Sequence, residues 1–266
     1  MTELSPSERR TELNRRLDAT LASADAGGLS LARSTVLECP DRWFGQLVAL
    51  SYDAAADAPD ADAALPAATA VELLRGYCRL RYDLLTDRDD HAAATDRDTT
   101  AVLLAGDYLN SAAYAAFSRV EDGPPRDGFD ALTAALQTIV EGFDAAYARS
   151  AAESESLLDD TVGALGEGAA VVGATIAGID DPGREPFADL GRGFSAARHV
   201  QRVLDSAGPD SLLPLDVEER DLRRYGAKRL REAEAGLDRL AGSADAASLR
   251  SFLAERAPDA IRSEPQ

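Results

Sequence analysis

The chain has 266 residues, of which 45% are hydrophobic, so it can bury a full core as one large domain or two small ones. It carries 47 Asp and Glu against 28 Lys and Arg, a formal net charge of −19 at pH 7. A diffuse negative charge repels phosphate backbones and anionic lipid, which argues against nucleic acid and membrane surfaces as partners. Acidity spread along the whole chain favours a halophilic setting, where concentrated salt screens the repulsion within a few ångströms.

Cys39 and Cys78 are the only cysteines, and they fall in different predicted elements without the spacing of metal ligands. This favours reduced, buried thiols over a disulfide. The first ten residues lack the apolar core of a signal peptide, and no apolar run approaches the roughly 18 residues that span a membrane. We therefore expect a cytoplasmic protein with no membrane span.

Apolar residues recur at helical spacing through most of the chain, and no sustained alternation predicts a strand. Ser5 and Glu8 form a capping box before the first helix. Asp41 is expected to cap the third helix, and Thr99 or Thr100 the fifth. The predicted helices cover 6–24, 29–38, 42–56, 67–87, 99–120, 129–150, 155–179, 187–207, 217–241 and 244–256.

No composition break, flexible linker or repeat of fixed period divides the chain. The pattern therefore predicts an all-α fold, a single-domain helical bundle over 1–257, with a frayed C-terminal tail at 258–266. The glycines of the predicted helix 155–179 should let neighbouring helices approach closely, at some cost in intrinsic helix stability. These are Gly163, Gly166, Gly168 and Gly173.

Asp83 and Asp87 are four residues apart at the end of one predicted helix, so their carboxylates project from the same face about one turn apart. Such a pair can hold Mg²⁺, a hard cation that takes oxygen ligands and often bridges to substrate phosphates. The alternative is a solvated helix end with an ion pair, since Arg79 precedes Asp83 by four residues. The spacing alone favours this alternative.

Other motifs carry little chemistry. His91 lies in a polar loop, and His199 lies within a predicted helix, where a surface or half-buried position is expected. The segment Gly193 to Ser195 resembles a nucleophile elbow only superficially, because it lies inside a helix. The pair Gly166 and Gly168 lacks the strand and the third glycine of a dinucleotide fingerprint.

Three phrases of the chain resemble the trans-isoprenyl diphosphate synthase, or polyprenyl synthetase, family. The segment AALPAATAVELLRG is similar to the entry of the family's first catalytic helix. The segment TTAVLLAGDYLNSAAYAAF is similar to the family's AVLxGDxLL helix, with Gly106 and Asp107 in place. The segment ALGEGAAVVGATIAGID is similar to the family's LGAxLAG helix. The resemblance covers nearly the whole chain. It implies the all-α bundle of the isoprenoid synthase type and, together with the acidity, a haloarchaeal source.

The metal-binding motifs of that family carry over only in part. The first DDxxD motif falls on Asp83 to Asp87, where Leu84 replaces the middle carboxylate. In the second motif, Gln201 and Arg202 replace two carboxylates, and Asp205 keeps the third. The basic elements that hold diphosphate in the family have no match in the corresponding segments, which are Glu38 to Arg42, 88–98 and Ala152 to Ser156.

The resemblance implies that these changes remove the reactive centre, because the family ionises an allylic diphosphate with Mg²⁺ held between two acidic faces. Arg198 and Arg202 should lie opposite Asp83 and Asp87. We interpret these four residues as ion pairs that replace the metal clamp. Cations in this position would exclude a metal by charge and could bridge the helices directly.

Arg75 and Arg79 lie on the same helical stripe as Asp83, where the family lines an apolar tunnel for its growing chain. An ion-paired stripe is a poor wall for a prenyl tail. The resemblance therefore implies a catalytically inactive, polyprenyl synthetase-like protein without a cofactor, a regulatory or structural subunit in isoprenoid biosynthesis. Because prenyl synthases commonly pair through the helix resembling AVLLAGDYL, it implies a homodimer or a heterodimer with an active prenyl synthase.

Two alternatives remain open. The chain could be an active, Mg²⁺-dependent prenyltransferase that makes isoprenyl diphosphates with Asp83, Asp87 and Asp205 as metal ligands. It could also be an unrelated acidic helical binding protein whose phrases match by accident. Chain elongation with Mg²⁺ distinguishes the active enzyme, and a structure without a central helical cavity would favour the unrelated binding protein.

Overall fold

The computed structural model of the chain describes residues 5–26, 29–86, 96–121, 125–148, 154–205, 217–240 and 246–255. Every regular element within those ranges is helical, which confirms the predicted all-α fold. The elements are α1 Pro6–Ala26, α2 Ser30–Leu37, α3 Trp43–Ala55, α4 Leu65–Thr86, α5 Asp96–Phe117, α6 Pro125–Ala148, α7 Ser154–Leu158, the π-helical turn η1 Asp159–Gly163, α8 Ala164–Ile176, α9 Asp181–Asp205, α10 Glu219–Leu240 and α11 Ala247–Glu255. The predicted tail, 258–266, lies outside the described residues.

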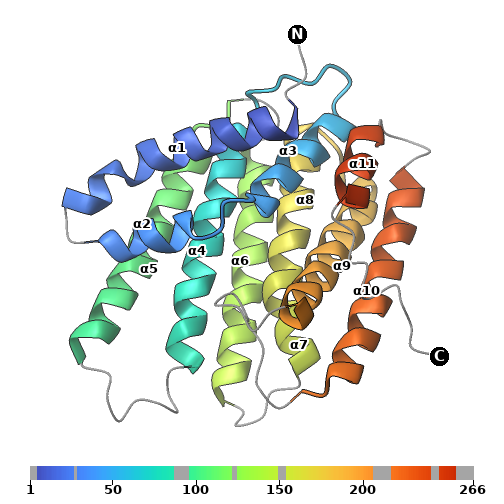
Figure 1. The fold of residues 1–266 in the computed structure, drawn as a ribbon. Helices are drawn as coiled ribbons and strands as arrows, with labels where there is room; N and C mark the ends of the chain where they lie inside the picture. Colours follow the sequence, from blue (N-terminus) through green and yellow to red (C-terminus); the bar gives the residue numbers. More distant parts are fainter. Residues whose placement is uncertain are drawn as a thin grey trace.

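The helices form one bundle in which α5 packs on α4, α6 on α8, α8 on α9 and α9 on α10, while α1 crosses one end (Figure 1). Helix α3 lies in the interior, and every side chain from Trp43 to Tyr52 is buried. It packs against α4, α8 and α11. None of the described helices is both long and apolar enough to cross a membrane.

The predicted capping box begins α1. The backbone N–H of Ser5 donates to Glu8 Oε2 at 2.9 Å, and the backbone N–H of Glu8 donates to Ser5 Oγ at 3.3 Å. These reciprocal bonds satisfy two donors that a helix start leaves without intrahelical partners. The prediction for this helix start is confirmed.

Three other predicted helix starts are wrong. Helix α5 begins at Asp96, so Thr99 and Thr100 lie inside it and do not cap it. Helix α6 begins at Pro125 and α9 at Asp181, each four or six residues before the predicted start. Proline has no backbone N–H, but in the first turn of a helix that N–H would have no intrahelical partner. The prolines that suggested turns before α6 and α9 are therefore compatible with helix starts.

The predicted helix 155–179 is divided by a π-helical turn. Helix α7 ends at Leu158, η1 covers the next five residues, and α8 begins at Ala164. π-turns are rare and occur often at functional sites. Here the turn places Thr161 and Val162 on an internal cavity, while Asp159 accepts a hydrogen bond from the hydroxyl of Tyr225 in α10 at 2.5 Å.

Two glycines allow α8 to cross its neighbours at short range, as predicted. A Cβ atom at Gly166 would lie 2.3 Å from the carbonyl oxygen of Gly191 in α9. A Cβ atom at Gly173 would lie 2.2 Å from the carbonyl oxygen of Val48 in α3. Any larger residue at either position would push two buried helices apart.

Candidate functional site

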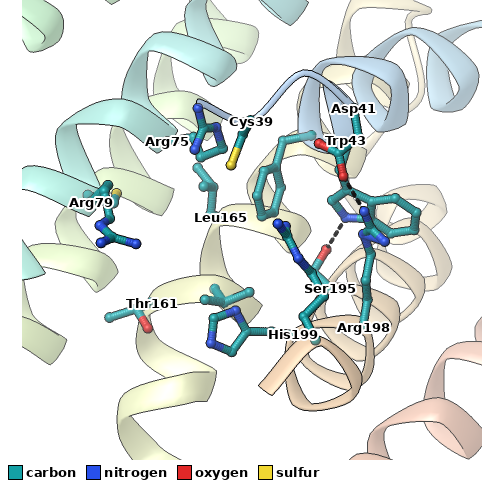
Figure 2. A pocket seen from close by; sticks show the side chains of 14 residues that line it. Cys39, Asp41, Trp43, Arg75, Arg79, Thr161, Leu165, Ser195, Arg198 and His199 are labelled. Carbon is teal, nitrogen blue, oxygen red and sulfur yellow. Dashed lines mark hydrogen bonds and ion pairs between the residues drawn. The ribbon is translucent and has the colours of Figure 1, made fainter. Parts of the chain in front are cut away.

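A cavity of about 80 Å³ lies inside the bundle, with α4 on one side and α9 on the other (Figure 2). Four arginines line it: Arg75 and Arg79 from α4, and Arg198 and Arg202 from α9. Each pair is four residues apart, so it occupies one face of its helix. The apolar part of the lining comes from Trp43, Phe44, Cys78, Val162 and Leu165.

Arg198 is held from two directions. Its guanidinium group donates to the carboxylate of Asp41, and it lies over the ring of Trp43, 4.7 Å from the ring centroid. The indole N–H of Trp43 in turn donates to Ser195 Oγ at 3.0 Å, and the ring stacks on Phe252 of α11 at a centroid distance of 5.3 Å. These contacts fix the position of the guanidinium group at the cavity.

Asp41 was expected to cap α3, and this prediction is wrong. No side chain caps this helix, and its first flanking residue, Arg42, has a left-handed backbone with φ 51°. Burial raises the pKa of Asp41, but the charges of Arg198, Arg202 and Arg75 outweigh burial and lower the pKa below its ordinary value. Asp41 is therefore a carboxylate held ionised by surrounding arginines.

Behind the cavity, one buried carboxylate serves two arginines. Glu72 is fully buried, and its carboxylate lies 3.4 Å from Arg75 Nε and 3.8 Å from Arg42 Nη1. It also accepts the backbone N–H of Gly45 at 2.8 Å. The second terminal nitrogen of Arg75 donates to the carbonyl of Val36 at 3.1 Å. Arg75 therefore has a fixed orientation beside the cavity.

No protein-family model matches the chain. It is 31% identical over 163 residues to the geranylgeranyl diphosphate synthase of Methanosarcina mazei, and 27% identical over 165 residues to the short chain isoprenyl diphosphate synthase of Methanocaldococcus jannaschii. These alignments cover 56% and 58% of the chain, and the chain spans about half the length of both curated relatives.

Solved structures match more of the chain. The geranylgeranyl pyrophosphate synthetase of the archaeon Geoglobus acetivorans matches with a TM-score of 0.71 over 97% of both chains, at 19% identity. The chain is thus similar in sequence to archaeal isoprenyl diphosphate synthases and shares the fold of geranylgeranyl pyrophosphate synthetases. The geranyl diphosphate synthase small subunit from Antirrhinum majus has the same fold, with a TM-score of 0.55 over 85% of this chain and 93% of that one, at 18% identity.

In this relative of the prenyl synthases, the predicted metal ligands do not line the cavity where they are described. Asp83 lies 2.8 Å from Arg79 Nε of its own helix, which is the ion pair that the spacing favoured. Asp205 is exposed and accepts a hydrogen bond from Gln201 Nε2 at 2.6 Å. Asp87 lies outside the described residues.

The predicted pairing of Arg198 and Arg202 with the Asp83 face stays a prediction. The structure gives Arg198 a carboxylate partner in Asp41. Arg202, at the exposed end of α9, lowers the pKa of that same Asp41 by its charge. Both arginines of α9 therefore interact with Asp41. An ion pair with Asp83 of α4 would be additional to this interaction.

A magnesium ion does not fit the described lining of the cavity. Mg²⁺ needs oxygen ligands, usually including one or two carboxylates, and the one carboxylate among the lining residues is Asp41, already bound by Arg198. In the described part of the chain, no three His, Cys, Asp or Glu side chains lie close enough together to hold a metal. The donor set at this cavity is suited to an anion.

Sequence reasoning missed half of this site. His199 was expected at a surface or half-buried position, yet it is buried and lines the cavity. Asp41 was assigned as a helix cap, Ser195 was set aside as a superficial nucleophile-elbow match, and Trp43 was not considered as a site residue. The one signal that pointed to Trp43 is that it is the only tryptophan in an otherwise aromatic-poor chain. His91 lies outside the described residues.

Proposed function

We propose that this chain is a non-catalytic, prenyl-synthase-like subunit that acts in isoprenoid biosynthesis by associating with an active synthase. The observation that carries the proposal is the set of four arginines on the central cavity, where family resemblance places the metal-binding faces. Guanidinium groups repel a divalent cation and offer it no oxygen ligand. Without metal ions, an allylic diphosphate loses the groups that would stabilise its departing charge.

We further propose that Arg198 and Arg202 take over the structural work of metal ions by joining α9 to the acidic end of α4 through Asp83 and Asp87. Arg198 already joins α9 to the segment before α3 through the carboxylate of Asp41. This contact supports ion pairing as the way in which α9 holds its neighbours. It costs less desolvation than a buried ion pair, because Asp41 keeps 33% of its side-chain surface exposed.

The size of the cavity also supports a non-catalytic role. A volume of about 80 Å³ holds roughly five to eight water molecules, whereas sites for larger organic ligands measure about 300–1,000 Å³. A growing prenyl tail would need a continuous apolar tunnel. Trp43 is fixed on Phe252 at one side of this space, and Leu165 lines it as well.

A chain-elongation assay tests this part of the proposal. The purified chain is incubated with isopentenyl diphosphate, an allylic diphosphate and Mg²⁺, with an active prenyl synthase as the positive control. We expect no longer isoprenyl diphosphate above background. Elongation by the chain that is lost in Asp83→Asn and Asp205→Asn would refute the proposal and establish the active-enzyme alternative.

A second observation supports the proposed association. Four large apolar side chains of the described residues are more than a third exposed, and all lie on α5 or α6: Leu103, Leu104, Phe129 and Val140. We name this set the α5–α6 surface. Exposed apolar surface on a folded chain often marks an interaction site. The family resemblance of α5 favours pairing through this surface, as a homodimer or as a heterodimer with an active prenyl synthase.

Co-purification tests the choice of partner. The tagged chain is isolated from its native cell and its bound proteins are identified, with a variant carrying Leu104→Arg as the matched control. We expect a synthase with both acidic motifs intact to accompany the unaltered chain and to be depleted from the variant. The absence of any such synthase from both samples would leave the homodimer and refute the heterodimer.

A further inference from the structure

A groove lies at the end of the bundle where α1 passes α4 and α5 (Figure 1). Its described lining comes from these three helices and from Arg119, just after α5, and it shares no described residue with the central cavity. We name it the α1–α5 groove. Its volume is about 320 Å³, which falls within the range of roughly 300–1,000 Å³ that is usual for small-molecule sites.

Three arginines line the α1–α5 groove. Arg15 and Arg16 belong to α1, and Arg119 follows the last residue of α5. Glu12 accepts hydrogen bonds from Nε of Arg15 at 2.7 Å and from Nε of Arg16 at 2.8 Å. The side chain of Arg119 makes no ion pair or hydrogen bond with the described residues. Because a guanidinium group has five N–H donors, all three arginines keep donors that these bonds do not use.

The carboxylates near these arginines do not close the groove. Glu12 and Asp62 pair with arginines of α1, but neither is among the residues that line the groove. The distance from Arg16 Nη2 to Asp62 Oδ1 is 3.3 Å, and the side chain of Asp62 is 74% exposed. Exposed ion pairs of this kind contribute little free energy. A ligand oxygen can therefore take the place of Asp62 at small cost.

Two threonines give the groove acceptors as well as donors. Thr20 Oγ1 donates to the carbonyl of Arg16 at 2.9 Å, and Thr69 Oγ1 donates to the carbonyl of Leu65 at 2.8 Å. A hydroxyl group has one hydrogen, which is used here, and two lone pairs, which can still accept. A ligand that uses the whole groove thus needs charged oxygens for the arginines and hydroxyl donors for the threonines.

We propose that the α1–α5 groove binds the phosphate monoester of a sugar or polyol. A phosphate group presents oxygens in several directions and carries about two negative charges, so it can meet Arg119 and the arginines of α1 at the same time. A carboxylate has two oxygens in one plane and one charge. The proposal goes beyond the proposed function and does not depend on it, because no described residue of the central cavity takes part.

The alternative is that these arginines only stabilise their own helices. Arg15 and Arg16 form pairs with Glu12 at spacings of three and four residues, which stabilise a helix. Arg119 lies near the C-terminal end of α5, where the helix dipole favours a cation. These roles predict that Arg119→Gln changes the stability of the chain and that the groove binds no ligand.

Calorimetric titration of the full chain distinguishes the two. Glucose 6-phosphate is the probe, and glucose, inorganic phosphate and gluconate are compared with it at low ionic strength. We expect saturable binding of glucose 6-phosphate, weaker binding of inorganic phosphate and gluconate, and none of glucose. Added salt should weaken the binding, and bound glucose 6-phosphate should raise the urea midpoint of unfolding.

Each comparison can overturn a part of the proposal. If glucose 6-phosphate does not bind saturably, the groove is not a ligand site. If inorganic phosphate binds as tightly, the threonines do not recognise hydroxyl groups. If gluconate binds as tightly, the arginines do not select a phosphate group.

Matched variants locate the site. Arg119→Gln should weaken the binding of glucose 6-phosphate about tenfold or more, as expected for loss of a charge-assisted hydrogen bond. Arg126→Gln is the control, since Arg126 lies on α6 with its side chain 91% exposed and does not line the groove. Both positions are exposed, so both variants should fold, which circular dichroism checks. Equal affinity of the two variants would overturn the site.

Two further variants complete the test. Thr20→Val should bring the affinity for glucose 6-phosphate close to that for inorganic phosphate and leave the affinity for inorganic phosphate unchanged. An unchanged preference for the sugar phosphate would count against the threonine as its acceptor. Arg202→Gln alters the central cavity instead. Binding that is lost in Arg202→Gln and kept in Arg119→Gln would place the ligand in the central cavity and overturn the proposal.

Discussion

Replacing Glu72 by Gln should lower the stability of the chain. The Glu72 carboxylate is buried between Arg42 and Arg75, at 3.8 Å and 3.4 Å. Glutamine keeps the size of the side chain, and its oxygen can still accept the backbone N–H of Gly45, which now bonds Glu72 at 2.8 Å. The substitution removes the charge and also replaces the oxygen that faces Arg42 and Arg75 with an amide NH2 group, which cannot accept their hydrogen bonds.

The expected loss of stability comes from Arg42, whose side chain is only 1% exposed. Burial lowers the pKa of this guanidinium group, and the charge of Glu72 opposes that effect. Removing one partner of a buried ion pair costs roughly 3–5 kcal/mol. Arg42 keeps hydrogen bonds to Asn14 Oδ1 and to the Val36 carbonyl, both at 2.6 Å. We therefore expect about 3 kcal/mol, or a fall in Tm of roughly 6–12 °C.

Urea unfolding followed by tryptophan fluorescence measures the stability. The control is Glu219→Gln, whose carboxylate pairs with Arg223 at 2.7 Å and is 67% exposed. It should cost less than about 1 kcal/mol. If Glu72→Gln is as stable as this control, the carboxylate does not hold the buried arginine.

Four further outcomes are expected. Gly173→Ala should destabilise the chain by about 1–3 kcal/mol, because its Cβ would lie 2.2 Å from a backbone oxygen of α3. Gly106→Ala, whose Cβ would lie 3.7 Å from its nearest atom, should stabilise the chain by about 0.5–1 kcal/mol. If the urea midpoints of both variants fall equally, the packing argument is wrong. Burial raises the pKa of Cys78 to about 12, so the thiol should resist a thiol reagent at mildly alkaline pH until the chain is unfolded, and modification in native buffer would contradict its burial. Leu104 is 54% exposed, so Leu104→Arg should change the free energy of unfolding by no more than about 0.5 kcal/mol. The same variant should reduce self-association or partner binding in analytical ultracentrifugation. Unchanged association would exclude the α5–α6 surface. The pKa of Asp41 is lowered in the folded chain, so its ion pairing stabilises the fold fully at pH values above the ordinary pKa of about 3.9, and this stabilisation is lost as the pH falls through the lowered pKa. Asp41→Asn should therefore make the free energy of unfolding depend less on pH in acid. An unchanged dependence on pH would count against this pairing.

Local patterns predicted most of the fold, because helical periodicity and capping depend on residues a few positions apart. The Ser5 capping box and the Arg79–Asp83 pair are both of this kind, and the structure confirms both. Two of the three wrong helix starts, those of α6 and α9, lie at a proline that was interpreted as part of a turn. Pro125 opens a helix, although the same signal before a helix also marks turns.

The candidate site was harder to predict because its contacts are distant in sequence. Asp41 and Arg198 are 157 residues apart, and Trp43 and Ser195 are 152 apart. No spacing rule reaches that far, so the carboxylate that pairs with Arg198 was assigned instead as a helix cap. The family resemblance supplied the two facing helices, and with them the arginines, but it could not supply the partner of Arg198.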